Sequence, residues 1–248
     1  MRMQRLIPPF LMVLCLLFGS QLVGCGTGDL AGTSRSQSDV GAPPILLHDP
    51  SPGQLEAYIY VTMGGYDPTT RETTSIGLSF SSNGRVVQFA GHERLTCNGT
   101  AMLLQNQAAS LQVAQAPTST LEGRPFSCTY SAGGTSATLS LTIPYAPVIR
   151  SPQDRAQVPR STHTPITYEA RSEKLLGIVA LGPEAKAIAR LDTPSRMHAT
   201  VNTSTFSMGA GSLSLTQMFD LQVTQTGTPF KSLGERGTAM TMVTVTWV

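Results

Sequence analysis

Apolar and polar residues alternate with a period of two through most of the chain beyond residue 45. In Glu56–Met63 and again in Ala137–Ile143, every second residue is apolar. This alternation predicts β-strands that turn one face towards a core. The strands expected from this pattern are residues 56–63, 76–80, 86–89, 102–104, 111–113, 126–130, 137–143, 166–170, 176–181, 186–190, 197–201, 213–224 and 238–248.

Turn residues divide these strands into two groups. Ser82-Asn83-Gly84 and Gly133-Gly134 predict hairpin turns, and Pro144-Tyr145-Ala146-Pro147 predicts a short stiff linker. Closely spaced strands with such turns are typical of β-sandwiches. We therefore expect an all-β chain with one sandwich at residues 45–145 and a second at 146–248. Two alternatives stay open: a single larger barrel, and one or two turns of helix within residues 106–116.

The first residues are typical of a signal peptide. Two arginines, Arg2 and Arg5, precede an apolar run over residues 6–18, and a short polar break follows. The alternative is a transmembrane helix, which needs about 20 apolar residues. Pro8 and Pro9 and the Gly-Ser-Gln break at residues 19–21 argue against it. We expect residues 1–24 to be removed and residues 25–44, which are small and polar, to form a flexible tether.

The end of the leader resembles the lipobox of bacterial lipoproteins. The residues that carry the resemblance are Leu22-Val23-Gly24-Cys25. It implies that Cys25 becomes the N-terminus and receives a diacylglycerol that holds the protein on the extracytoplasmic side of a membrane. Gly26 replaces the Asp of an inner-membrane retention signal, which implies the outer membrane in a host that has two membranes.

Charge and cysteine content fit export. Loss of the leader lowers the basic residues from 17 to 15, equal to the 15 acidic residues, so the mature chain is neutral. Nucleic-acid binding is therefore not expected. Cys97 and Cys128 remain as an even pair in an oxidising compartment, which predicts a disulfide. The alternative, a metal or redox thiol pair, lacks a CxxC spacing.

Part of the first domain resembles a bacterial immunoglobulin-like domain. Pro125–Tyr130 followed by Thr138–Ile143 is similar to its strands F and G. The resemblance implies that Cys97 lies on strand B or its neighbour and that the bridge to Cys128 joins the two sheets. The sequence departs from this family at two points. Phe126, two residues before Cys128, stands where the family has the tyrosine of the tyrosine corner. No tryptophan lies between Cys97 and Cys128, because the single tryptophan is Trp247. The second domain resembles the same class through Ser151-Pro152 near its start and through the spacing of its expected strands.

The sequence has no recognisable motif of a catalytic, cofactor or metal site, so we expect neither an enzyme nor a bound cofactor or metal. The four histidines do not have metalloprotease spacing, and no Gly-x-Ser-x-Gly or calcium-loop motif occurs. The histidines are His48, His92, His163 and His198. An extracytoplasmic enzyme of unfamiliar type is the less favoured alternative.

Aromatic residues give the one candidate binding site. Tyr58 and Tyr60 should face away from the core on one strand, and Tyr66 follows closely. Exposed aromatic rings offer flat apolar faces to sugars, although cross-strand packing is the commoner role. The expected function is a non-catalytic binding or structural module of the cell envelope, anchored to the membrane through lipid on Cys25. The expected partner is a glycan or an envelope protein, and the second hypothesis is a lipoprotein that binds carbohydrate or peptidoglycan.

Overall fold

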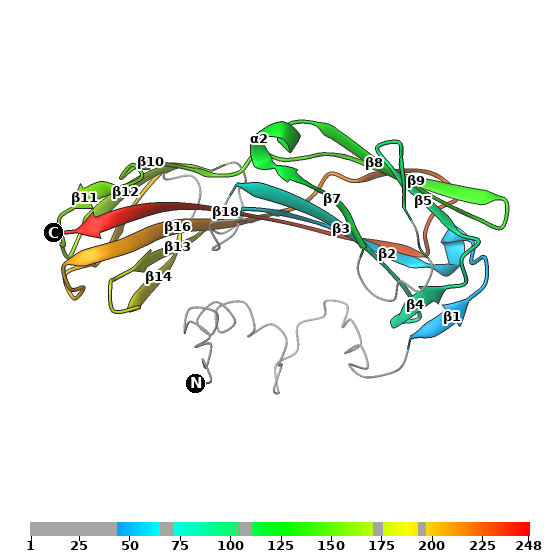
Figure 1. Cartoon of the computed structure of the whole chain (residues 1–248), viewed down its shortest axis with the longest axis horizontal. Coiled ribbons are helices and arrows are strands. Elements are labelled where there is room, and N and C mark those ends of the chain that lie inside the picture. The colour runs from blue at the N-terminus through cyan, green and yellow to red at the C-terminus, as the bar shows by residue number, and fades with distance from the viewer. Residues whose placement is uncertain (1–43, 65–71, 103, 105–110, 171–175, 193–196) are drawn as a thin grey trace, which may run out of the picture.

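The computed structural model describes residues 44–64, 72–102, 104, 111–170, 176–192 and 197–248. The regular secondary structure of these ranges is almost entirely β-strand, with one 3-10 turn, η1 (Pro52–Gln54), and one short helix, α2 (Thr118–Leu121) (Figure 1). The expected leader, the lipidation site Cys25 and residues 25–43 of the expected tether lie outside the described residues. Tyr66 and residues 106–110 also lie outside them.

The strands of the first half are β1 (Ile45–Leu47), β2 (Glu56–Met63), β3 (Thr73–Ser82), β4 (Arg85–Phe89), β5 (Arg94–Cys97), β6 (Thr100–Met102), β7 (Leu111–Pro117), β8 (Pro125–Ala132) and β9 (Thr135–Thr142). Those of the second half are β10 (Val148–Ser151), β11 (Ala156–Val158), β12 (Thr164–Glu169), β13 (Leu176–Leu181), β14 (Ala187–Asp192), β15 (His198–Val201), β16 (Gly209–Phe219), β17 (Thr224–Gly227) and β18 (Ser232–Trp247). Both predicted hairpins form, at Asn83-Gly84 between β3 and β4 and at Gly133-Gly134 between β8 and β9. Residues 111–117 form a strand, and the helical turn follows it.

The first sandwich places the five-stranded sheet β17-β9-β8-β5-β6 against the β1-β4-β3-β2-β18 part of the large sheet. Its core takes alternate residues from both sheets, as the sequence pattern predicts. Four rings meet in this core with centroids 5.3 to 6.1 Å apart. They are Phe80, Phe89, Tyr130 and Phe230.

The second sandwich has an immunoglobulin-like arrangement. The three-stranded sheet β10-β12-β15 faces β18-β16-β13-β14, and β11 runs parallel to β18. Three strands against a sheet built around β18-β16-β13 match the ABE and GFC strands of that fold. Residues of both sheets fill one core around Trp247, whose Nε1 donates to the Leu181 carbonyl at 2.9 Å. The fold class is therefore all-β with two immunoglobulin-like sandwiches, as predicted.

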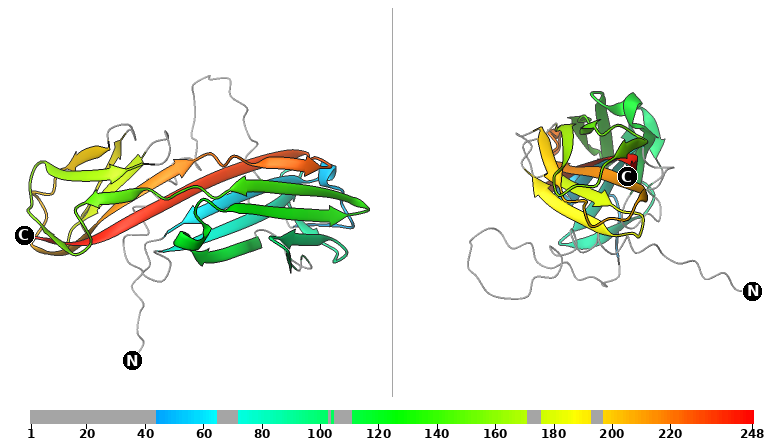
Figure 2. Two further views of the ribbon diagram at one scale, coloured as in Figure 1. Left: turned by 90° about the horizontal axis from the view of Figure 1, so that it is seen from above. Right: turned by 90° about the vertical axis from the view of Figure 1, so that its left-hand side faces the viewer.

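Strand β18 belongs to both sandwiches (Figure 2). Its first half pairs in parallel with β2, from Ser232 opposite Glu56 to Ala239 opposite Met63. Its second half pairs with β16 in the antiparallel sense, up to Trp247 opposite Gly209. With 16 residues, such a strand spans about 53 Å. The two cores are thus joined by continuous sheet as well as by the linker at residues 144–147.

The chain crosses from one core to the other more than once. The expected second domain, 146–248, supplies four buried residues to the first core: Phe219, Leu221, Phe230 and Ala239. The expected strand 213–224 ends at Phe219, and a separate strand, β17, then pairs with β9. Residues 219–239 therefore complete the first sandwich before β18 returns to the second.

Polar residues mark the waist between the cores. On β16, Leu215 belongs to the second core and Phe219 to the first, while Gln217 between them is buried. On β18, the Thr241 hydroxyl donates to the carbonyl of Pro147 in the linker. This hydrogen bond attaches the linker to β18 at the level where one apolar core ends and the other begins.

A substitution at Gly211 on β16 would test the packing around Trp247. A Cβ at this position would lie 2.0 Å from Trp247 Nε1 and 2.3 Å from the Leu181 oxygen. Gly211→Ala should therefore lower the free energy of unfolding by about 1–3 kcal/mol or more, measured by denaturant unfolding. Gly177→Ala on neighbouring β13 is the control, because its Cβ would meet only ordinary contacts at 3.5 Å or more. Equal stabilities of the two variants would contradict this packing.

Candidate functional site

Cys97 and Cys128 form a disulfide within one sheet. They lie opposite each other on the adjacent strands β5 and β8, with a Cα–Cα distance of 4.1 Å. The next pair along is hydrogen-bonded, with Asn98 N–H donating to the Ser127 carbonyl at 2.9 Å, so the cysteines occupy the closer, non-hydrogen-bonded position. The expectation that the bridge joins the two sheets is wrong, because β5 is the direct neighbour of β8.

The four histidines are exposed: His48 follows β1, His92 precedes β5, His163 precedes β12 and His198 lies on β15. His48 and His92 are next in sequence to Asp49 and Glu93, which are hydrogen-bonded to each other. Within the described ranges, no three or more His, Cys, Asp or Glu residues are grouped so that they could hold a metal ion. The same ranges contain no helix long and apolar enough to cross a membrane.

The tyrosines predicted to face outward lie on β2 in the middle of the large sheet. Ala57, Ile59 and Val61 are buried in the first core, whereas Tyr58 and Tyr60 are half-buried on the opposite face. Strand pairing places small residues on both sides of Tyr58. Ser79 and Gly234 flank Tyr58.

Tyr60 lies across the neighbouring strand instead of standing upright on the sheet. A Cβ on Gly77 of β3 would fall 1.9 Å from Tyr60 Cζ and 2.1 Å from its Oη, so the far end of the ring covers the glycine. This is the cross-strand packing that the sequence left as the alternative, and it covers backbone that glycine leaves bare. Tyr60 is half-buried in this position.

Sheet pairing brings two further polar side chains into line with Tyr60. Arg236 on β18 is opposite Tyr60, Gly77 follows on β3, and Gln112 on β7 is opposite Gly77. Arg236 and Gln112 are both exposed. We call the set Tyr58, Tyr60, Gly77, Gln112 and Arg236 the tyrosine face. Residues 58 and 236 are distant in sequence, so only the parallel pairing of β2 with β18 reveals this grouping.

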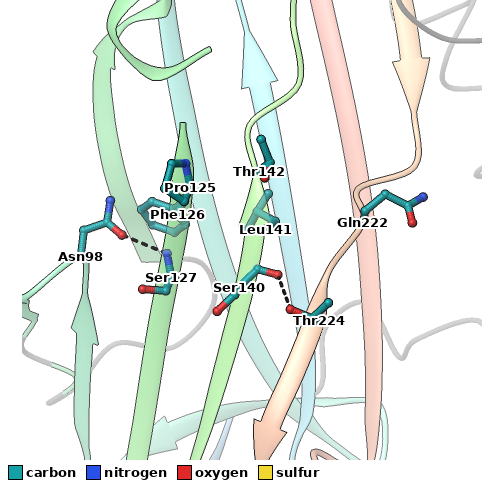
Figure 3. A pocket seen from close by; sticks show the side chains of 9 residues that line it. All are labelled: Asn98, Pro125, Phe126, Ser127, Ser140, Leu141, Thr142, Gln222 and Thr224. Carbon is teal, nitrogen blue, oxygen red and sulfur yellow. Dashed lines mark hydrogen bonds between the residues drawn. The ribbon is translucent and has the colours of Figure 1, made fainter. Parts of the chain in front are cut away.

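A shallow pocket opens on the other sheet of the first sandwich, where β17 diverges from β9 (Figure 3). Its volume is about 470 Å³. The lining side chains are Asn98, Pro125, Phe126, Ser127, Ser140, Leu141, Thr142, Gln222 and Thr224. Two hydrogen bonds organise it: Ser127 N–H donates to Asn98 Oδ1 at 2.9 Å, and the Thr224 hydroxyl donates to the Ser140 carbonyl at 3.2 Å.

The chemistry of this pocket is that of neutral hydrogen bonding. Its polar groups are hydroxyls and carboxamides, and Phe126 and Leu141 contribute buried apolar side chains. None of the lining residues titrates near neutral pH. Such a lining can hold a neutral polar group but provides no general acid or base.

A buried carboxylate fixes the segment that follows the expected tether. Glu93 is 5% exposed, and its oxygens accept the N–H groups of Asp49 at 3.0 Å and Gly91 at 2.8 Å. Burial alone would raise the pKa of Glu93, but these backbone donors outweigh burial and hold the pKa below 4.5. Beside it, the Tyr130 hydroxyl donates to the Pro50 carbonyl at 2.8 Å. Burial, together with the charges of Glu93 and Asp49, raises the pKa of Tyr130.

The Glu93 cluster predicts a specific dependence of stability on pH. Because the folded-state pKa lies below the unfolded value, ionised Glu93 stabilises the fold above about pH 4.5, and this contribution is lost as pH falls through the folded pKa. Glu93→Gln should lower the free energy of unfolding by about 1–3 kcal/mol at pH 7. The difference from the unsubstituted chain should shrink towards pH 3 or so in urea unfolding. The control for charge loss is Glu235→Gln, on an exposed side chain, and a pH-independent difference would contradict the assignment.

No protein-family model and no curated protein matches the chain. Among solved structures it is similar to a tetra-tandem repeat from the extending region of a large adhesion protein, at 10% identity and a TM-score of 0.22. That match covers 76% of this chain and 49% of the other, so the chain spans about half of that structure. It is also similar to a chimeric titin Z1Z2 tandem, at 12% identity and a TM-score of 0.24, covering 79% of this chain and 95% of that one. Scores of this size carry no argument about function.

Proposed function

We propose that the protein is a lipid-anchored, non-catalytic binding or structural module of the cell envelope that extends from the membrane as a stiff arm. The observation that carries the proposal is β18, which runs unbroken through both sandwiches and pairs with β2 in one and β16 in the other. A continuous sheet resists bending at the waist more than a peptide linker alone, because bending would break ladder hydrogen bonds.

The position of the tether supports this arrangement. The first described strand, β1, lies at one end of the elongated body, and the C-terminal residue Val248 lies at the other (Figures 1 and 2). Between Cys25 and Pro44 the sequence has 18 residues, most of them small or polar. An anchor at Cys25 would therefore place the first sandwich near the membrane and the second farther out.

The disulfide supports an extracytoplasmic location. Cys97 and Cys128 are bonded and buried. Structural disulfides form and persist in oxidising compartments and are rare in the cytosol. A signal peptide with lipidation at Cys25 would deliver the chain to such a compartment.

The carboxylates support a non-catalytic role, because several of them hold the fold together. Glu93 accepts two backbone N–H groups, Asp154 accepts the Thr244 N–H, and Glu122 accepts the Ala146 N–H beside the linker. Glu56 accepts the Ser81 hydroxyl and the Gly84 N–H. A carboxylate bound in this way stabilises loops and is poorly placed to exchange protons with a substrate.

The anchor is tested by replacing its cysteine. In cells fed a labelled fatty acid, Cys25→Ala should abolish incorporation of label and leave the precursor unprocessed, because the thiol is the acceptor of the lipid. Cys15→Ala is the matched control, because Cys15 lies within the expected leader and should leave labelling unchanged. Label that persists in Cys25→Ala would refute the anchor.

A further inference from the structure

We propose that the outward face of the five-stranded sheet β17-β9-β8-β5-β6 binds an acidic glycan. Serine and threonine hydroxyls on this face bond to the sugar hydroxyls, and Arg94 pairs with the acidic group. The inference deepens the proposed function by naming a ligand class and a surface, and it rests on that function only for a location outside the cytoplasm.

Strand register aligns hydroxyl groups in rows across this face. Cys97, Cys128 and Leu139 belong to the core, so the residues that alternate with them point outward. The middle row crosses four adjacent strands, from β5 to β17, and consists of Thr96, Thr129, Thr138 and Thr226. The row on one side is Ser127, Ser140 and Thr224, and the row on the other side is Arg94, Ser131 and Ser136. We call these three rows the hydroxyl face.

Both outer rows of the hydroxyl face line hollows in the surface. The row of Ser127, Ser140 and Thr224 lines the shallow pocket of about 470 Å³ (Figure 3). The row of Arg94, Ser131 and Ser136 lines a second hollow of about 390 Å³ beside the Gly133-Gly134 hairpin, together with His92. Successive rows are two residues apart along each strand, so the two outer rows lie about 14 Å apart. The hydroxyl face is therefore long enough for more than one sugar ring of a chain.

Arg94 gives the hydroxyl face its charge. It is the one charged side chain in the three rows, it is exposed, and no other described residue bonds to its guanidinium. No carboxylate is among the described residues that line the two hollows. The adjacent Glu93 is buried, and its oxygens already accept the N–H groups of Asp49 and Gly91. The guanidinium is therefore available to a carboxylate or phosphate, which it bonds through two parallel N–H groups.

The chemistry of the hydroxyl face favours a glycan over other macromolecules. A protein partner requires an apolar centre, and a nucleic acid requires many cations, whereas these rows offer hydroxyls and one cation. A hydroxyl both donates and accepts, as the hydroxyls of a sugar do. The Thr129 and Thr138 hydroxyls are bonded to each other at 2.8 Å, and because only one of them donates, the other keeps its proton for a ligand.

The experiment measures binding of the full chain, purified in detergent, by microscale thermophoresis. The probes are a hexamer of α-1,4-linked galacturonic acid, the neutral methyl ester of that hexamer and a phosphate-bearing core oligosaccharide of lipopolysaccharide. At least one acidic probe should bind roughly tenfold more tightly than the ester, because only an acid pairs with Arg94, and which acid binds identifies carboxylate or phosphate as the source. Arg94→Gln should remove this preference. The double variant Thr129→Val/Thr138→Val should weaken binding of the same probe roughly tenfold, and it leaves neither hydroxyl without its partner.

The matched controls lie in the second sandwich. Arg155→Gln removes an exposed charge and Thr167→Val removes an exposed hydroxyl on β12, so both should leave binding unchanged. Circular dichroism reports that each variant is folded. The proposal is overturned if neither acidic probe binds, if the ester binds as tightly as the acids, or if either Arg94→Gln or the threonine double variant binds as the unsubstituted chain does. Lipid labelling at Cys25 tests the anchor separately.

Discussion

The pairing of β18 with two different partners is the constraint on which the structure depends. Ser232–Ala239 completes the first sandwich beside β2, and the same strand continues to Trp247 at the centre of the second core. Removing β18 would open both sheets. The neighbouring strand β16 crosses the waist in the opposite direction and carries Phe219 into the first core. The two sandwiches therefore share structure, and neither is completed by a contiguous stretch of chain.

The same pairing creates the tyrosine face. Parallel register sets Arg236 beside Tyr60, and antiparallel register sets Gly77 on its other side. Near the expected tether, the Glu93 carboxylate accepts a hydrogen bond from the Asp49 N–H, and the Tyr130 hydroxyl donates one to the Pro50 carbonyl. The end of the body nearest the expected anchor is thus fixed by hydrogen bonds between segments far apart in sequence. The tyrosine face therefore lies on the large sheet, whereas Tyr130 lies on β8 of the five-stranded sheet.

Alternation along the sequence predicted strands and their faces well, because side-chain direction in a strand depends only on local geometry. It placed Tyr58 and Tyr60 opposite the core residues of β2, while the turn residues Asn83-Gly84 and Gly133-Gly134 predicted the two hairpins. It could not predict partners, because period-two patterns are alike in every strand. For that reason the residues around Tyr60 were not found. The resemblance to an immunoglobulin-like domain implied a bridge between the sheets, whereas Cys97 and Cys128 lie on adjacent strands of one sheet. The proline linker also suggested a boundary at 145, whereas residues 219–239 pack with the first core.

The most direct test of a shared fold is whether a destabilising substitution in one core also lowers the stability of the other core. Trp247 is the single tryptophan and is fully buried in the second core, so its fluorescence reports that core. Leu139 is 1% exposed in the first core, and Leu139→Ala should destabilise that core by about 2–5 kcal/mol. If β18 and β16 couple the sandwiches, the Trp247 transition in denaturant should move to lower concentration together with the circular dichroism transition. A Trp247 transition that stays in place while a separate transition moves would contradict the account.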